Sequence, residues 1–254
     1  MGRDHNEQIR AQFTRQAAPF AAAAEIRAEE ALGRIVETAQ AGPTDTVLDV
    51  ACGPGLLACA FARVVQHVTG IDLTPRMLEQ ALALQRRERL ANLTWHEGDV
   101  EHLPYSDASF SVVTSRFAFH HFLDPLAVLE EMRRVCRPGG RIVVADAAPA
   151  SDKAEAFNRM ERLRDPSHAR ALSVEELQAL FAAAELPIPV IRRDDLRYEL
   201  ESFLARSFPN EGDADRVRQL FEESIETDHL GVRAFREDGQ IRFWYPTAIA
   251  ASLV

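Results

Sequence analysis

Short apolar runs alternate with amphipathic stretches through the first 150 residues of the chain. The apolar runs are bounded by turn residues, which predicts buried strands; they lie at 46–51, 67–72, 92–99, 110–115 and 141–149. The stretches between them carry apolar residues at helical spacing; they lie at 53–66, 74–90 and 124–136. Strands that alternate with helices through short connections predict an α/β fold, in which helices cover both faces of a mostly parallel sheet.

The pattern is less regular outside this part of the chain. Helical spacing predicts further helices; they cover 6–40, 173–186 and 199–228, the last broken at 208–213. The second of these starts with Ser173 and Glu176 at the spacing of a capping box. Runs at 187–200 and 241–254 predict two more strands, which brings the sheet to seven. Pro246 is expected to place part of the last strand at an edge or a bulge.

We expect a single domain over residues 1–254. Its core would be residues 41–150, which carry the alternating strands and helices. Residues 1–40 would form a helical cap, and residues 151–254 would add the remaining strands and a helical lid.

Composition and charge narrow the class of protein. The 254 residues are 46% hydrophobic and 27% charged, which is ordinary for a globular protein and excludes a mainly disordered chain. The net charge of −10 argues against a nucleic-acid binder, which needs a basic surface. Cys52, Cys59 and Cys136 show no zinc-binding spacing, so we expect reduced thiols, no metal and a cytoplasmic location. The polar N-terminus predicts no signal peptide, and no apolar run is long enough for a membrane span.

The clearest candidate for ligand binding is a glycine loop between the first strand and the first helix of the core. Gly53 and Gly55 permit a tight turn and a close approach of the backbone to a ligand, although such a turn can need glycine for local reasons alone. Asp72 follows about 20 residues after Gly53, at the end of the second strand, where a carboxylate suits the two hydroxyls of a ribose. Loop and acid together predict a ligand that contains a nucleoside.

Five ordered blocks between about residues 45 and 148 resemble one family. They read VLDVACGPG, GIDLTPRMLEQA, GDVEHLPYSDASFSVV, HHFLDP and RRVCRPGG. Together they resemble the class I S-adenosylmethionine-dependent methyltransferases, and most of all the subgroup that includes the ubiquinone and menaquinone C-methyltransferases. QFTRQAAPF near the N-terminus also resembles the lead-in helix of that subgroup. The resemblance implies a Rossmann-like fold, S-adenosyl-L-methionine as cofactor and a small-molecule acceptor.

The resemblance also implies which residues bind the cofactor; these are Asp49, Ala51, Gly53, Pro54, Gly55, Asp72, Leu73, Met77, Asp99, Val100 and Arg116. The loop from Asp49 to Gly55 would hold the methionine end, and Asp72 the ribose. Asp99 would accept a hydrogen bond from the adenine amino group, while the backbone N–H of Val100 would donate one to the ring. Ala51 stands where the family usually has glycine.

A nicotinamide dinucleotide is the alternative ligand for this loop. Its pyrophosphate would lie at the helix N-terminus, close to the carboxylate of Asp49. That carboxylate repels phosphates and attracts the ammonium group of a methionine. Asp99 has no role in dinucleotide binding, so both acids favour S-adenosylmethionine.

The candidate catalytic residues are His120 and His121, which follow the fourth strand where ligands gather in parallel sheets. A histidine there could remove a proton from the acceptor, although methyl transfer from a sulfonium can also proceed by alignment alone. One of the two is expected to face the cleft, with His121 favoured because related sequences often place their single histidine there. Either histidine can instead be a packed structural residue. The sequence RFAF at 116–119 replaces the Asn/Asp-Pro-Pro-aromatic tetrad of the amino-directed branch, which favours a carbon or oxygen acceptor over nitrogen.

Candidate residues for binding the acceptor come from both ends of the chain; they are Phe13, Phe20, Arg162, Arg164 and His168. The two arginines could form a fork that grips an anion, or could be ordinary surface ion pairs. The aromatic residues of the C-terminal part fit a lid, a packed core or a homodimer interface. Two other functions stay open: a non-catalytic S-adenosylmethionine-binding protein, and an enzyme of the same fold that acts on protein or RNA.

Overall fold

Consecutive residues of the central strands are buried in two different hydrophobic cores. The structure is a computed structural model, which describes residues 2–23 and 29–254. Val112 and Val143 lie in one core, whereas Val113 and Val144 lie in the other. Side chains alternate between the faces of a strand, so a strand that is apolar at every position must be covered on both faces. The apolar runs of the sequence therefore form the interior of a layered α/β fold.

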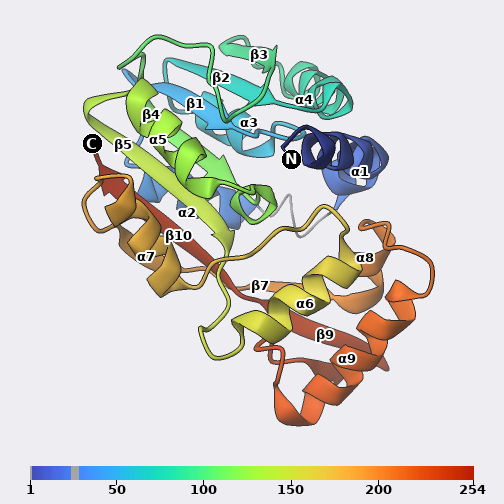
Figure 1. Ribbon diagram of the computed structural model, residues 1–254. Helices are drawn as coiled ribbons and strands as arrows, with labels where there is room; N and C mark the ends of the chain where they lie inside the picture. Colours follow the sequence, from blue (N-terminus) through green and yellow to red (C-terminus); the bar gives the residue numbers. More distant parts are fainter. Residues whose placement is uncertain (1, 24–28) are drawn as a thin grey trace.

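The large sheet has seven strands in the order β3-β2-β1-β4-β5-β10-β6 (Figure 1). They are β1 (Thr46–Val50), β2 (His67–Asp72), β3 (Leu93–Glu97), β4 (Phe110–Arg116), β5 (Cys136–Ala147), β6 (Val190–Arg193) and β10 (Thr247–Leu253). Strands β1 to β5 are parallel to one another. Strand β10 lies between β5 and β6 and is antiparallel to both. The predicted mostly parallel sheet of seven strands is confirmed.

Helices cover both faces of this sheet. On one face lie α2 (Glu29–Thr38), α3 (Leu56–Ala62) and α4 (Pro75–Glu88). On the other lie α5 (Pro125–Val135) and α7 (Val174–Ala183). The capping box that begins α7 is confirmed, because the Ser173 side chain accepts from the Glu176 N–H and the Glu176 side chain accepts from the Ser173 N–H.

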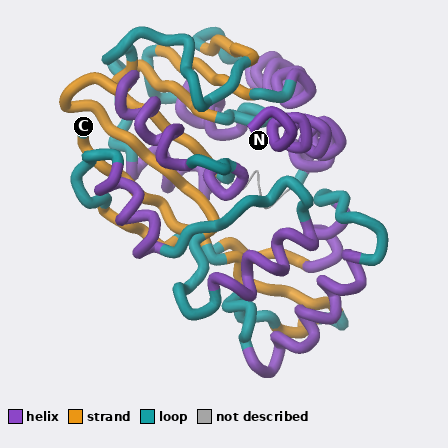
Figure 2. Tube along the Cα trace, in the orientation of Figure 1, coloured by secondary structure: helices purple, strands orange, loops and turns teal. Residues whose placement is uncertain are grey.

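A smaller unit is formed by segments that lie between β5 and β10 in the sequence, and Figure 2 shows its strands behind a layer of helices. It contains α6 (Ala154–Arg164), α8 (Leu200–Ala205), α9 (Asp213–Thr227), β7 (Leu196–Glu199), β8 (Phe235–Glu237) and β9 (Gln240–Tyr245). Its three antiparallel strands have the order β7-β9-β8. The expected lid is thus not purely helical, because it has a sheet of its own.

Two predicted strands are each divided between the two sheets. The segment 187–200 forms β6 and β7, and the segment 241–254 forms β9 and β10. The two segments pair with each other in both sheets. Arg193 lies opposite Ala248 in the large sheet, and Leu196 lies opposite Tyr245 in the small one. Both segments leave one sheet and enter the other here, and Pro246 lies between β9 and β10, where no ladder N–H is needed. The expected edge position is wrong for β10, which is an interior strand.

The predicted N-terminal helix at 6–40 is two helices. The first is α1 (Gly2–Ala22), which packs against α4 (Figure 1), and the second is α2. Residues 24–28 lie outside the described residues. None of the described helices is long and apolar enough to cross a membrane.

Candidate active site

The glycine loop joins β1 to α3 at the carboxyl end of the parallel strands. Ala51, Gly53 and Gly55 all have positive φ, of 54°, 51° and 75°. The left-handed region costs a residue with a Cβ roughly 1–2 kcal/mol, which explains why glycine is usual at the position of Ala51. Asp72 holds the loop in place, because its carboxylate accepts the N–H of Gly53 at 2.8 Å and that of Thr74 at 2.8 Å.

Gly55 has a packing role. A Cβ on Gly55 would lie 2.6 Å from Cη2 of Trp95 and 2.9 Å from Cβ of Ala81. The absence of a side chain lets the start of α3 approach α4 and β3 closely. Gly55 does not line the pocket described next, and its contact with the ligand stays a prediction.

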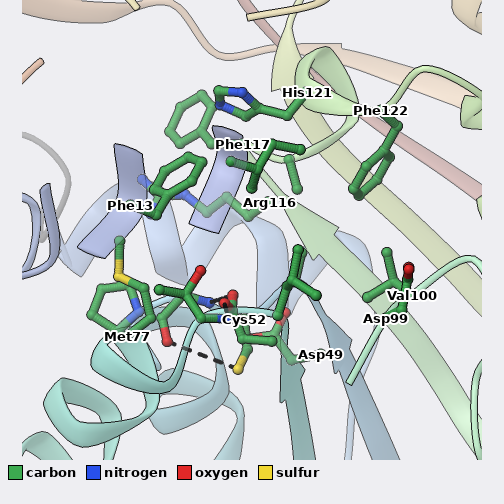
Figure 3. Close-up of a pocket in the computed structure, with 18 of the residues that line it drawn as sticks. Phe13, Asp49, Cys52, Met77, Asp99, Val100, Arg116, Phe117, His121 and Phe122 are labelled. Carbon is green, nitrogen blue, oxygen red and sulfur yellow. Dashed lines mark hydrogen bonds between the residues drawn. The ribbon is translucent and has the colours of Figure 1, made fainter. Parts of the chain in front are cut away.

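A pocket with about 1050 Å³ of empty space lies over this loop. Ten of the eleven residues predicted to bind the cofactor line it: Asp49, Ala51, Gly53, Pro54, Asp72, Leu73, Met77, Asp99, Val100 and Arg116. Figure 3 shows Phe13, Phe117 and His121 on one side of the pocket and Asp49 and Met77 on the other. The sequence blocks that lie far apart along the chain therefore converge on one cavity.

Two ionisable side chains on the pocket wall each have a buried polar atom without a partner among the described residues. Among the described residues, none forms a hydrogen bond with Oδ2 of Asp49 or with Nη2 of Arg116. Burial raises the pKa of Asp49 to about 8, although the nearby Arg116 opposes this shift. Burial also lowers the pKa of Arg116, whose guanidinium lies 4.6 Å from the ring centre of Phe117. Buried polar atoms are normally satisfied, so these two indicate a polar ligand.

The first helix supplies a wall of the pocket, of which the sequence predicted only Phe13 and Phe20. Nδ2 of Asn6 donates to Oδ2 of Asp99 at 2.8 Å, and Nε2 of His5 lies 2.8 Å from the carbonyl oxygen of His121. The inward residues of α1 are spaced by three and four; they are Asn6, Ile9, Phe13, Gln16 and Phe20. Only Phe13 and Phe20 were predicted, although this spacing along one helix face was readable.

A second compartment, with about 450 Å³ of empty space, adjoins the first. The two share Phe13, Phe20, Phe117 and His121. The other lining residues are Gln16, His120, Arg164, Asp165, Tyr198, Phe203, Arg206 and Tyr245. Tyr198 comes from β7 and Tyr245 from β9, so this wall depends on the smaller sheet, which the sequence pattern did not predict.

The adjacent histidines differ in their partners. Nδ1 of His120 forms a short hydrogen bond with Oδ1 of Asp146. Burial alone would lower the pKa of His120, but the charge of Asp146 outweighs it and raises the pKa. His121 instead has Nδ1 at 3.0 Å from the carbonyl oxygen of Ser167, and burial together with the charge of His120 lowers its pKa to about 3.

The predicted arginine fork is not formed. Arg164 is buried, and its Nε and Nη2 donate to Glu161 at 3.0 and 2.7 Å. Arg162 is exposed and lines neither compartment. His168 is buried outside both compartments, where its Nε2 lies 2.7 Å from Oδ1 of Asn158. Within residues 2–23 and 29–254, no His, Cys, Asp and Glu side chains are grouped to hold a metal ion.

Comparisons with known proteins agree with this geometry. Residues 48–144 match the family model described as "Methyltransferase domain". The chain is 35% identical to the "uncharacterized methyltransferase YcgJ" of Bacillus subtilis over 193 residues, which cover 75% of each protein. The crystal structure of that YcgJ protein has a TM-score of 0.79 at 28% identity, and covers 88% of this chain and 97% of its own. A segment of 115 residues is 38% identical to the "ubiquinone/menaquinone biosynthesis C-methyltransferase UbiE" of Bdellovibrio bacteriovorus, covering 44% of this chain and 48% of the relative.

The fold, the glycine loop with its acids and these relatives all indicate one cofactor. The match to methyltransferases excludes a nicotinamide dinucleotide as the ligand. The same match identifies an enzyme and not a protein that only binds the cofactor. The chain belongs to the class I S-adenosylmethionine-dependent methyltransferases.

Proposed function

We propose that the protein transfers a methyl group to a carbon or oxygen atom of a small molecule held in the second compartment. The observation that carries this proposal is the junction of the two cavities at Phe13, Phe20, Phe117 and His121. An acceptor on one side of that junction would lie next to a methyl donor on the other. Holding two reactants in line supplies much of the rate enhancement of a displacement reaction.

The residues of the first pocket fit S-adenosylmethionine, which when bound supplies a methyl group on a positively charged sulfur. The partnerless Oδ2 of Asp49 suits the ammonium group of the methionine part. Asp72 uses one lone pair of each oxygen on a backbone N–H and keeps others for two ribose hydroxyls. Asp99, with the backbone of Val100, lies on the wall where an adenine edge would be bound.

The second compartment favours a flat, small acceptor. Six aromatic side chains line it: Phe13, Phe20, Phe117, Tyr198, Phe203 and Tyr245. Aromatic walls select flat or apolar molecules. Because helix α1 and the smaller unit both contribute to these walls, a small molecule suits the compartment better than a folded protein surface or an RNA helix. The named C-methyltransferase among the relatives supports carbon as one target atom.

Two measurements test this proposal. Calorimetry should show saturable binding of S-adenosylhomocysteine, the product of methyl transfer. Small hydroxylated and carbonyl-containing molecules should then be incubated with S-adenosylmethionine, and each product should be heavier by one methylene unit. A protein that binds S-adenosylhomocysteine but methylates only protein or RNA would contradict the small-molecule acceptor.

A further inference from the structure

His120 and Asp146 form a pair that resembles the base-and-carboxylate part of a proton-transfer site. Asp146 is buried, and its Oδ2 accepts the N–H of Ala118 at 3.1 Å while its Oδ1 accepts that of Ala147 at 2.6 Å. These bonds fix the carboxylate in position. Although burial raises the pKa of Asp146, the charge of His120 outweighs it and lowers that pKa, so Asp146 stays ionised.

The hydrogen bond determines which nitrogen of His120 is basic. A carboxylate can only accept, so Nδ1 carries the hydrogen of that bond. Nε2 is then the nitrogen left to take a proton, as in the histidine–aspartate pair of a hydrolase triad. His120 is one of the residues that line the second compartment, together with the aromatic side chains.

His121 is the poorer base of the two. Its Nδ1 donates to the carbonyl oxygen of Ser167, a neutral partner that stabilises the imidazolium less than a carboxylate does. The ring of His120 lies 4.2 Å away, so a proton on one histidine disfavours a proton on the other. The proton acceptor is therefore expected at His120 and not at the position that the sequence favoured.

We propose that His120, positioned by Asp146, takes the proton from a weakly acidic hydroxyl group on a flat acceptor in the second compartment. The inference rests on the proposed function of the two cavities. The acceptor O–H bond breaks and its proton goes to Nε2 of His120. The electron pair released, at the oxygen or at a conjugated carbon, forms the bond to the methyl carbon, while the electrons of the carbon–sulfur bond remain on sulfur.

Other charged groups near His120 set the pH at which it works. Glu161 of α6 supports its positive charge, and Arg164 of α6 opposes it. His121 and His168 lie beside its ring, at centroid distances of 4.2 and 5.4 Å. Burial and the neighbouring histidines lower the pKa of His168, so it stays neutral. Asp146 is thus the main support for a proton on His120.

The test uses 4-nitrophenol, because its phenolate form absorbs visible light and its phenol form does not. Protein saturated with S-adenosylhomocysteine is titrated with this probe at pH 6, where the free probe is mostly protonated, and at a series of higher pH values, because the pKa of His120 is raised and only its neutral ring can take a proton. The wild-type protein is expected to bind it saturably as the phenolate. His120→Gln is expected to reduce the phenolate fraction at least tenfold, which is about one unit of pKa. Asp146→Asn should move phenolate formation to higher pH.

Control variants separate the two histidines. The variant His121→Gln shows whether the second histidine has the same effect. The matched control for the substitution is His229→Gln, because His229 lines neither compartment. Melting temperature and S-adenosylhomocysteine affinity are measured for each variant. Failure of the wild type to bind S-adenosylhomocysteine would contradict the proposed function itself. Normal binding of S-adenosylhomocysteine with no probe binding, or with the probe bound as neutral phenol, would overturn only this inference.

Nitrogen NMR of the wild-type protein keeps the test decisive if a variant does not fold. With ¹⁵N-labelled histidine, and at a pH above the raised pKa of His120, the ring of His120 is expected to carry its only hydrogen on Nδ1 in the free protein and to become doubly protonated when the probe binds. A ring that stays neutral, or a phenolate signal lost in His121→Gln and kept in His120→Gln, would overturn the assignment.

Discussion

Asp72 illustrates how one residue can serve the fold and the ligand together. Its two oxygens hold the N–H groups of Gly53 and Thr74, and the same carboxylate lines the first pocket. An ionised carboxylate has about four sites that accept hydrogen bonds, so two remain for a ribose. Asparagine has only one oxygen, which explains why an acid suits the end of β2.

Replacing Asp72 is therefore expected to weaken cofactor binding. Asp72→Asn loses charge-assisted hydrogen bonds of roughly 1.5–3 kcal/mol, which lowers the affinity for S-adenosylhomocysteine by roughly 10- to 150-fold. Calorimetry measures this change. Asp124→Asn is the matched control, because Asp124 also accepts a backbone N–H, from Ala127, but lines neither compartment. Unchanged affinity in a folded Asp72→Asn protein would exclude the ribose role.

Asp49 is expected to couple cofactor binding to proton release. Its pKa of about 8 means that it is mostly protonated at pH 7 in the free protein. An ammonium group beside it favours the carboxylate, so binding of S-adenosylhomocysteine should release up to one proton, and the affinity should rise as the pH rises towards 8. Calorimetry in buffers of different ionisation enthalpy measures the protons released.

Asp49→Asn provides the comparison for this effect. Asparagine has the same shape and does not titrate, so proton release should disappear and the affinity should change little between pH 6 and pH 8. Equal proton release by the wild type and Asp49→Asn would show that the proton comes from another group.

At the scale of elements, α1 links the two halves of the molecule. Near its start, Asn6 donates to Asp99 beside the large sheet. About three turns further on, Gln16 donates to Asp165 at 2.9 Å and to the carbonyl oxygen of Ser207 at 3.1 Å, both in the C-terminal part. A helix attached at both ends in this way can cover the two compartments, as lids do in many enzymes.

Hydrogen exchange should detect this covering role. Binding of S-adenosylhomocysteine is expected to slow exchange in residues 5–13 of α1, because they line the first pocket. Helix α9 lines neither compartment and serves as the internal control, so its exchange should not change. Protection confined to residues 45–148 would show that α1 does not close over the cofactor.

At the scale of the whole molecule, the pocket should discriminate between two nucleotide cofactors. Asp49 lies at the glycine loop, where the pyrophosphate of a dinucleotide would bind, and above its pKa of about 8 the ionised carboxylate repels a phosphate. S-adenosylhomocysteine is therefore expected to bind, and NADH is expected to bind far more weakly or not at all. Competition calorimetry compares them, and tighter binding of NADH would contradict the role of Asp49.

Much of the fold and of the cofactor pocket followed from the sequence alone. Parallel strands are apolar throughout and their carboxyl ends meet at one edge, so local patterns were enough to predict the sheet. The family resemblance added the roles of Asp49 and Asp99, which line the same pocket as Asp72. The capping box of α7 also followed from the local pattern, because it depends only on near neighbours.

Tertiary structure decided the acceptor compartment and the roles within it. Its walls join residues more than 100 positions apart, such as Gln16 and Asp165, and no local pattern encodes such a contact. The division of two strands between sheets brought Tyr198 and Tyr245 to this wall. The different partners of His120 and His121 likewise depend on distant residues, Asp146 and Ser167. A hydrogen-bond partner sets the charge of a buried histidine, so only the folded chain could distinguish the two.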